Sequence, residues 1–179
     1  IKCLQLANGA VYTDDKRADF QDLHDVKLQA LDEIVEEANG MPVLVAYNFK
    51  HDLTRPKKAF PGAIDLRTSD GLRAAKRGEG RVWLGHPASM GHGVDGLQNH
   101  CNQLAFFGHW WNLEERLQII ERVGPTRQKQ AGFDRPVFIH NIIARGTVDE
   151  MVIERVNSKR EVQDILLDAM RRRKEKRWN

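Results

Sequence analysis

Cysteine is scarce in this chain, and long apolar runs are missing from it. Cys3 and Cys101 are the only cysteines among 179 residues. The N-terminus lacks the basic and apolar stretches of a secretory signal, so two reduced thiols are expected rather than a disulfide. No apolar run approaches the roughly 20 residues of a membrane span, so we expect no membrane partner and a cytoplasmic location. The chain also lacks a starting Met, and we expect it to be cut from a longer protein.

Motifs that would give the chain a complete catalytic centre are missing too. It has no Gly-x-x-x-x-Gly-Lys-[Ser/Thr] phosphate loop and no Gly-x-Ser-x-Gly nucleophile elbow. The two Asp-Glu pairs, Asp32-Glu33 and Asp149-Glu150, lie in predicted helices, whereas a Mg²⁺-binding carboxylate should follow a strand. No metal site is expected, because no known ligand spacing occurs among the neighbouring candidates His86, His92, His100 and Cys101.

The overall composition is that of an ordinary globular domain. Hydrophobic residues make up 41% and charged residues 30%, which is enough to bury a core. The formal charge of +3 permits nucleic-acid binding but does not require it. We expect one domain over 1–179, with a lead-in at 1–24 that the patterns do not assign and a basic tail at 171–179. That tail could bind a nucleic-acid backbone, but a solvated, frayed end is the favoured interpretation.

Helical and strand patterns alternate along the rest of the chain. Helices are expected at 25–39, 49–55, 69–77, 113–123 and about 147–173, the second of them stopped near Pro56. Strands are expected at 42–47, 63–66, 81–85, 103–107 and 137–143. This alternation predicts a parallel α/β sheet. Ligands in such sheets bind at the carboxyl ends of the strands, so the loops after Tyr47, Gly85 and Phe107 are of functional interest.

A glycine-rich loop, His86–Gly96, follows one predicted strand directly. Closely spaced glycines let the backbone approach a ligand, and free amides there can bind phosphate. Gly91, Gly93 and Gly96 satisfy Gly-x-Gly-x-x-Gly, but five residues separate the strand from Gly91, so a dinucleotide site is discounted. For the loop as a whole, a structural turn and a ligand site stay equally open.

The second candidate feature begins at Trp110 and runs down the helix at 113–123. Gln118 and Arg122 are four residues apart and share one helix face. An arginine at a domain edge can stabilise charge on a transferring phosphate. Taken alone, a surface arginine in an ordinary helix is the favoured interpretation.

In their order, these segments resemble the second lobe of the Swi/Snf-type DNA translocases of helicase superfamily 2. The resemblance covers nearly the whole chain, most clearly 25–168, and is strongest to compact versions from bacteriophages and prophages. The matching segments are Lys27–Leu31 and Val43–Phe49 around motif IV, His86–Leu97 as motif V, Trp111-Asn112 with Gln118 and Arg122 as motif VI, and Gly146–Glu150 after the last strand.

Three positions depart from the family pattern. Pro125 stands where the second motif VI arginine is expected, and Arg127 can replace that arginine if the Gly124-Pro125 turn redirects the chain. Leu113 replaces the proline that follows Trp-Asn in the family, and Asp95 replaces an asparagine of motif V.

The resemblance implies a RecA-like parallel sheet flanked by helices, and half of an ATP site. ATP and Mg²⁺ would be bound mainly through an absent N-terminal lobe of the same protein, so the isolated chain should not hydrolyse ATP. Arg122, with Arg127, would act on the γ-phosphate, and Gln118 would position the nucleotide. The residues expected near nucleotide or DNA phosphate are Ser89, Gly91, His92, Gly93 and Asp95.

The partner implied by the resemblance is duplex DNA, in the host cytoplasm if the protein is phage-encoded. A second hypothesis stays open: a non-catalytic lobe that only binds DNA or another protein.

Overall fold

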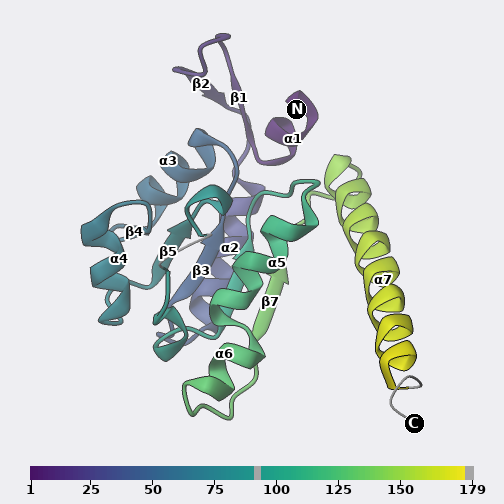
Figure 1. The fold of residues 1–179 in the computed structure, drawn as a ribbon. Coiled ribbons are helices and arrows are strands. Elements are labelled where there is room, and N and C mark those ends of the chain that lie inside the picture. The colour runs from purple at the N-terminus through teal and green to yellow at the C-terminus, as the bar shows by residue number, and fades with distance from the viewer. Residues whose placement is uncertain (91–93, 176–179) are drawn as a thin grey trace.

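A five-stranded parallel sheet forms the centre of the chain (Figure 1). The computed structural model describes residues 1–90 and 94–175. The strands are β3 (Val43–Ala46), β4 (Ile64–Asp65), β5 (Val82–Gly85), β6 (Gln103–Phe106) and β7 (Phe138–Asn141). Neighbouring strands pair in the order β4-β5-β3-β6-β7, and every pair is parallel. The predicted α/β sheet is confirmed, and each predicted strand lies within two residues of the observed one.

The two faces of the sheet bury different side chains of the same strands. On β3, Leu44 and Ala46 belong to one apolar core, whereas Val43 and Val45 belong to the other. All four are fully buried. Since successive strand residues point to opposite faces, a continuous apolar run is what a strand covered on both sides requires.

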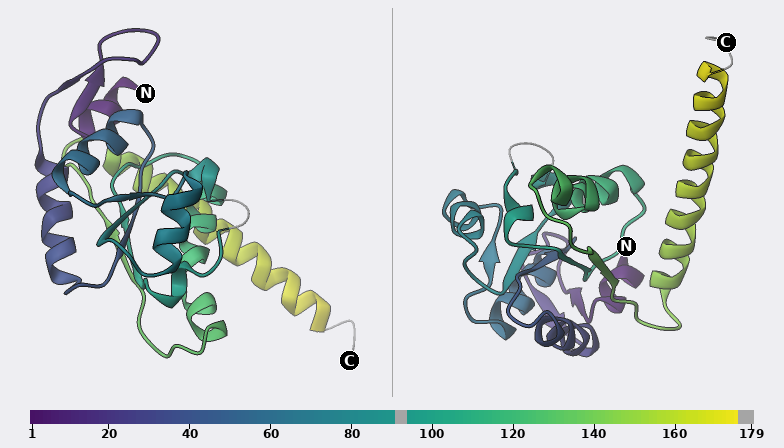
Figure 2. Two further views of the ribbon diagram at one scale, coloured as in Figure 1. Left: turned by 90° about the vertical axis from the view of Figure 1, so that its left-hand side faces the viewer. Right: turned by 90° about the horizontal axis from the view of Figure 1, so that it is seen from below.

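Helices cover both faces of the sheet (Figure 2). Residues of α2 (Val26–Glu37) and α3 (Lys50–Ala59) pack in the core that contains Val43, and residues of α4 (Ser69–Lys76) and α5 (Leu113–Val123) pack in the core that contains Leu44. The second core also contains residues of the short 3-10 turns Pro87–Ser89 and Leu97–Asn99 or next to them. The helices expected at 25–39, 69–77 and 113–123 are therefore confirmed.

Helix α3 corrects one prediction. The sequence predicted a helix over 49–55 that stops near Pro56, but α3 runs from Lys50 through Pro56 to Ala59, and the N–H of Phe60 donates to the Pro56 carbonyl oxygen at 2.8 Å. An interior proline costs about 3 kcal/mol relative to alanine. Buried contacts hold this helix against the rest of the lobe: Asp52 Oδ2 accepts a hydrogen bond from the Asn8 side chain, and Arg55 donates one to the Asn8 carbonyl oxygen.

The unassigned lead-in forms a helix and a hairpin. It consists of α1 (Lys2–Ala7) and of the antiparallel strands β1 (Ala10–Tyr12) and β2 (Phe20–Asp22). Tyr12 packs edge-on against Phe49, with ring centroids 6.4 Å apart. Both belong to a third apolar cluster, which also includes Val152 and Val156 in the first turns of the final helix. The lead-in therefore packs against the beginning of that helix, beside the start of α3.

The final helix, α7 (Val148–Glu175), extends away from the body of the molecule (Figures 1 and 2). Among the side chains that the structure describes on this helix, the buried ones are Asp149, Val152 and Val156, all in its first turns. The helix expected over about 147–173 is confirmed, and residues 176–179 of the predicted basic tail lie outside the described residues. Across 1–90 and 94–175, no helix combines the length and the apolar character that crossing a bilayer requires.

Candidate functional site

A corner between two helices places the predicted arginines. Helix α5 begins at Asn112, whose side-chain oxygen accepts hydrogen bonds from two backbone N–H groups of the first turn at 3.0 and 3.3 Å. It ends at Gly124, and Pro125 takes the first position of α6 (Pro125–Gln130). A Cβ on Gly124 would lie 2.7 Å from the Ile120 carbonyl oxygen, so the corner requires glycine. The sequence did not predict α6, and it named a redirecting Gly124-Pro125 turn only as the condition under which Arg127 could replace the missing arginine.

The corner brings three of the predicted site residues together. Arg122 lies in the last turn of α5 and Arg127 lies on α6, and both reach the same carboxylate oxygen, Oδ1 of Asp95. The Nη1 atoms lie 3.8 Å from it for Arg122 and 3.2 Å for Arg127. The side chain of Arg122 is 12% exposed, that of Arg127 33% and that of Asp95 64%. Two guanidinium groups thus converge at a surface that solvent and ligands can reach.

Gln118 lies one helical turn before Arg122 on α5 and is half-buried. Its neighbours Ile119 and Val123 are buried in the core on this side of the sheet, which fixes the rotation of the helix. Gln118 and Arg122 therefore share a face of α5, as their spacing predicted.

Part of the predicted glycine-rich loop is visible after β5. Ser89 is half-buried, and its hydroxyl donates to the His86 carbonyl oxygen at 2.8 Å. Met90 is fully buried and packs in the core beneath the loop. The loop thus has a structural role as well as free surface. Gly91, His92 and Gly93, also predicted to lie near phosphate, are outside the described residues.

Polar and aromatic side chains gather at the carboxyl ends of β3, β4 and β5. Tyr47 follows β3 and His86 follows β5, with their ring centroids 5.4 Å apart. The guanidinium carbon of Arg67, just past β4, lies 5.9 Å from the Tyr47 ring centroid. Arg67 also binds Asp65 through two hydrogen bonds of 3.0 and 2.8 Å. The sequence analysis singled out the loops after Tyr47 and Gly85, which lie at this edge of the sheet, but it did not single out Arg67.

Burial and charge shift the titration of these groups. Burial raises the pKa of Tyr47 to about 12 and lowers the pKa of His86, so both side chains favour their uncharged forms at neutral pH. Burial alone would raise the pKa of Asp65, but the hydrogen bonds from Arg67 outweigh it and lower that pKa. Arg67 therefore presents a cation at the sheet edge that is already paired.

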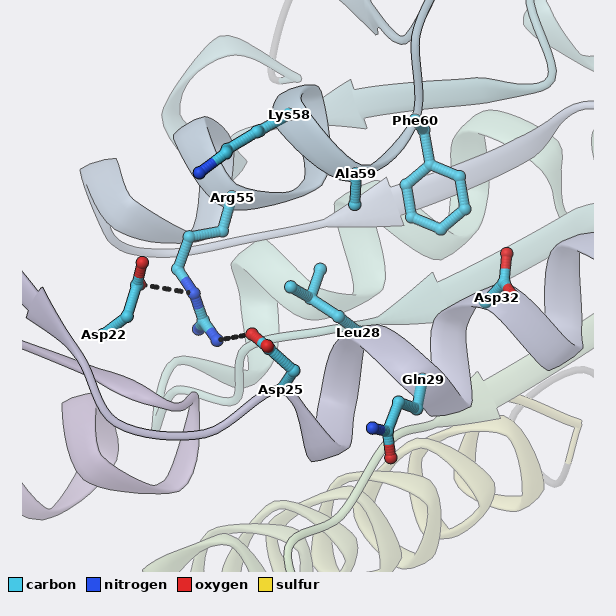
Figure 3. A pocket seen from close by; sticks show the side chains of 9 residues that line it. All are labelled: Asp22, Asp25, Leu28, Gln29, Asp32, Arg55, Lys58, Ala59 and Phe60. Carbon is cyan, nitrogen blue, oxygen red and sulfur yellow. Dashed lines mark hydrogen bonds and ion pairs between the residues drawn. The ribbon is translucent and has the colours of Figure 1, made fainter.

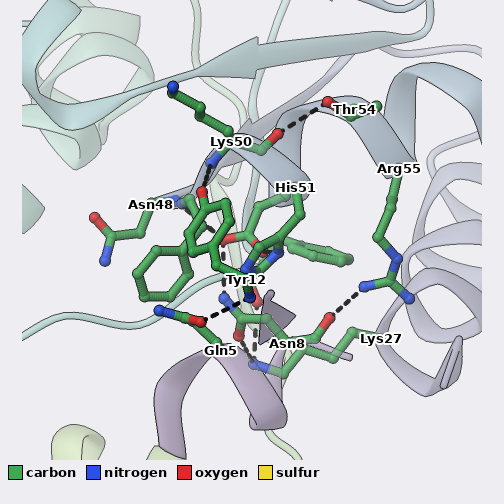
Figure 4. Close-up of polar contacts among 12 residues, drawn as sticks. Gln5, Asn8, Tyr12, Lys27, Asn48, Lys50, His51, Thr54 and Arg55 are labelled. Carbon is green, nitrogen blue, oxygen red and sulfur yellow. Dashed lines mark hydrogen bonds and ion pairs between the residues drawn. The ribbon is translucent and has the colours of Figure 1, made fainter. Parts of the chain in front are cut away.

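A buried polar network lies beneath α1 and joins distant segments (Figure 4). Lys27 Nζ donates to Asn8 Oδ1 at 2.8 Å and to the Phe107 carbonyl oxygen at 3.1 Å, and it lies 2.6 Å from Asp149 Oδ2. Asn8 in turn donates to Asp52 Oδ2 at 2.9 Å. Burial lowers the pKa of Lys27 more than the neighbouring Asp149 raises it. The network positions α2, α3 and α7 around the end of β6.

A pocket of about 530 Å³ lies between α2 and α3 (Figure 3). Leu28 and Phe60 contribute apolar surface, while Arg55 forms ion pairs with Asp22 and Asp25 at 2.9 Å. The described residues that line it include none of the predicted site residues, because both helices pack on the opposite face of the sheet from α5. The pocket is thus separate from the arginine pair.

Comparison with other proteins finds relatives of very different similarity. The chain is 55% identical over 174 residues to protein p41 of Acyrthosiphon pisum secondary endosymbiont phage 1, which covers 97% of this chain and 37% of that protein. A shorter match, 27% identical over 70 residues, is to the chromatin-remodeling ATPase INO80 of Cryptococcus neoformans, covering 37% of this chain and 4% of that protein. The chain thus spans little more than a third of its phage relative. No model of a known protein family matches.

Solved structures share the fold. The C-terminal part of the Fun30 ATPase domain superposes with a TM-score of 0.61 at 14% identity, covering 80% of this chain and 47% of that one. The Hef helicase domain of Pyrococcus furiosus gives a TM-score of 0.51 at 16% identity, covering 73% of this chain and 27% of that one. The predicted RecA-like lobe, and its resemblance to the C-terminal lobe of Swi/Snf-type ATPases, are confirmed at the level of the fold.

Proposed function

We propose that this chain is the C-terminal lobe of an ATP-dependent, helicase-like DNA translocase, acting in the cytoplasm of a phage host. The observation that carries the proposal is the convergence of Arg122 and Arg127 on one point of the surface. Two arginines held on adjacent helices are suited to stabilise the charge of a transferring phosphoryl group. The fold shared with ATPase and helicase domains supports placing that group at a lobe interface.

ATP and Mg²⁺ would be held mainly by an N-terminal lobe that precedes this chain. The first lobe would supply the phosphate loop and the Mg²⁺-binding carboxylates, neither of which the present sequence contains. This chain would close over the nucleotide, with Gln118 positioning it and Arg122 and Arg127 approaching the γ-phosphate. An arginine finger contributes about 10³–10⁵ in rate, so closure would control hydrolysis.

Duplex DNA is the proposed track, and its phosphates are the proposed contacts. Ser89 and the glycine-rich segment Gly91–Gly93 would lie near nucleotide or DNA phosphate, because closely spaced glycines let the backbone approach a ligand. The formal charge of +3 is compatible with contact to a polyanion. Closure on ATP and opening after hydrolysis would move the protein along the backbone.

ATP hydrolysis with and without duplex DNA tests the proposal. The 179-residue chain is compared with the longer protein that carries the preceding lobe. We expect no turnover from the chain alone and DNA-stimulated turnover from the longer protein. Turnover by the chain alone would reveal a nucleotide site of a different kind. If neither protein hydrolyses ATP but DNA or protein binding is retained, the translocase hypothesis is wrong and a non-catalytic binding module is the better description.

A further inference from the structure

Asp95 places a negative charge at the position where the proposed function would bind a more highly charged phosphoryl group. Its Oδ1 atom is the point at which Arg122 and Arg127 meet. We propose that the Asp95 carboxylate is a built-in competitor, which occupies the phosphoryl position between the two arginines until a phosphate-bearing ligand displaces it. The identity of the ligand in this inference rests on the proposed function. The competition itself rests only on the ion pairs of Asp95 with the two arginines.

The geometry favours an exchange over a permanent pairing. One oxygen atom serves both guanidinium groups, so a single tetrahedral phosphoryl group with several oxygens can contact both cations in its place. The contact distances of 3.8 and 3.2 Å are long for charge-assisted hydrogen bonds, which are typically about 2.7–2.9 Å. The carboxylate therefore offsets part of the positive charge of the two arginines without forming a short hydrogen bond to either of them.

Exposure makes the pairing weak enough to break. Asp95 is 64% exposed, whereas Arg122 is 12% exposed. Exposed ion pairs are screened by water and salt and contribute little net stability. The arginines, by contrast, are carried by the helices α5 and α6, which meet at the Gly124-Pro125 corner. A ligand that carries two or more negative charges can thus outcompete one exposed carboxylate.

The competition has a direct consequence for anion affinity. Without the carboxylate, the two arginines keep their charge, and the negative charge that Asp95 places beside them is removed. Replacing Asp95 by its isosteric amide should therefore tighten binding of a phosphate-bearing anion roughly three- to tenfold, as expected for removing one like charge a few ångströms from the ligand.

The test is calorimetric titration of the chain with inorganic tripolyphosphate at low ionic strength. Asp95→Asn should bind it roughly three- to tenfold tighter than the native chain. Asp95→Glu, which keeps the charge, should bind with close to native affinity. The matched control is Asp70→Asn, because Asp70 is also an exposed carboxylate paired with an arginine, Arg73, but on α4. That control should leave the affinity unchanged.

The double variant Asp95→Asn, Arg127→Ala tests whether the anion binds at the arginine pair. The tighter tripolyphosphate binding of Asp95→Asn should disappear in it. Unchanged or weaker binding by Asp95→Asn would overturn the proposal, as would an equal gain in Asp70→Asn or a gain that survives loss of Arg127. ATP turnover by the longer protein is a separate measurement. If the longer protein hydrolyses ATP but Asp95→Asn does not bind tripolyphosphate more tightly, only the inference about Asp95 is wrong. If Asp95→Asn binds more tightly but the longer protein does not hydrolyse ATP, only the proposed ATPase function is wrong.

Discussion

Lys27 and Asp149 form an ion pair in the interior of the protein, with Nζ 2.6 Å from Oδ2 and side chains that are 1% and 0% exposed. Lys27 lies on α2 and Asp149 in the first turn of α7, so the pair attaches the last helix to the body of the lobe. Asn8 and the Phe107 carbonyl oxygen complete the shell around the ammonium group. A charge that is buried in this way needs its partner.

Removing one member of this pair should destabilise the lobe strongly. Lys27→Met and Asp149→Asn should each lower the free energy of unfolding by about 3–5 kcal/mol, because each leaves an uncompensated buried charge. The double variant should lose less than the sum of the two. Urea unfolding measures these values, and Asp70→Asn, which breaks an exposed pair, is the control. Single variants no less stable than that control would contradict the burial of the pair.

Gly9 should be the less replaceable of two glycines with the same backbone conformation. Gly9 has φ of 90° and Gly40 has φ of 88°. A Cβ on Gly9 would lie 2.2 Å from the His24 carbonyl oxygen, whereas one on Gly40 would meet nothing within 4 Å. Gly40→Ala should cost about 1–2 kcal/mol from backbone strain alone. Gly9→Ala should cost about 1–3 kcal/mol more through the clash, as read from thermal unfolding. Equal costs would contradict the close approach of Gly9 to the His24 carbonyl oxygen.

Acid should destabilise the lobe through His109. Burial, followed by the charge of nearby Lys27, lowers the pKa of His109 from 6.5 to about 4. Because the unfolded chain then binds a proton more readily than the folded one, this contribution is complete above pH 6.5 and is lost as the pH falls toward 4. The loss should reach about 3 kcal/mol.

The comparison of the native chain with His109→Asn isolates that contribution, since His86 and His140 also have lowered pKa values and titrate in the same direction. Urea unfolding at a series of pH values should show a smaller pH dependence for the variant below pH 6.5. Identical slopes for the two chains would mean that His109 is accessible to protons in the folded state.

The two thiols should differ sharply in reactivity. Cys3 is exposed, whereas Cys101 is buried, and burial raises the pKa of Cys101 to about 11. Only the thiolate is nucleophilic, so a disulfide reagent at pH 8 should modify Cys3 rapidly and Cys101 only after unfolding. A Cys3→Ser variant should show no fast phase. Rapid labelling of Cys101 would contradict its position in the core.

The parallel sheet could be predicted because its signal is local. A strand such as Val43–Ala46, buried on both faces, is apolar at every position, and α5 shows its period in the spacing of Ile119 and Val123. The continuation of α3 through Pro56 could not be predicted locally, because Asp52 and Arg55 on that helix bond to Asn8, which is distant in sequence. The lead-in was missed for the same reason, since Tyr12 packs against Phe49 and the first turns of α7, both distant from it in sequence.

The candidate site was predictable in its components but not in its contacts. The order of the motifs singled out Gln118, Arg122, Arg127 and Asp95, yet no spacing rule states that one carboxylate oxygen meets both arginines. That meeting depends on the Gly124-Pro125 corner, whose angle sequence patterns do not specify. The pairing of Lys27 with Asp149, far apart in the chain, is beyond any local pattern for the same reason.

The measurement that tests the central claim most directly is ATP turnover by the longer, two-lobe protein carrying Arg122→Ala, with nucleotide binding measured on the same sample. Arg73→Ala on α4 is the matched control, as a second arginine paired with an aspartate. We predict that Arg122→Ala lowers DNA-stimulated turnover by about 10³-fold or more while nucleotide affinity changes little, and that Arg73→Ala leaves both intact. Native turnover in the Arg122→Ala protein would contradict the account.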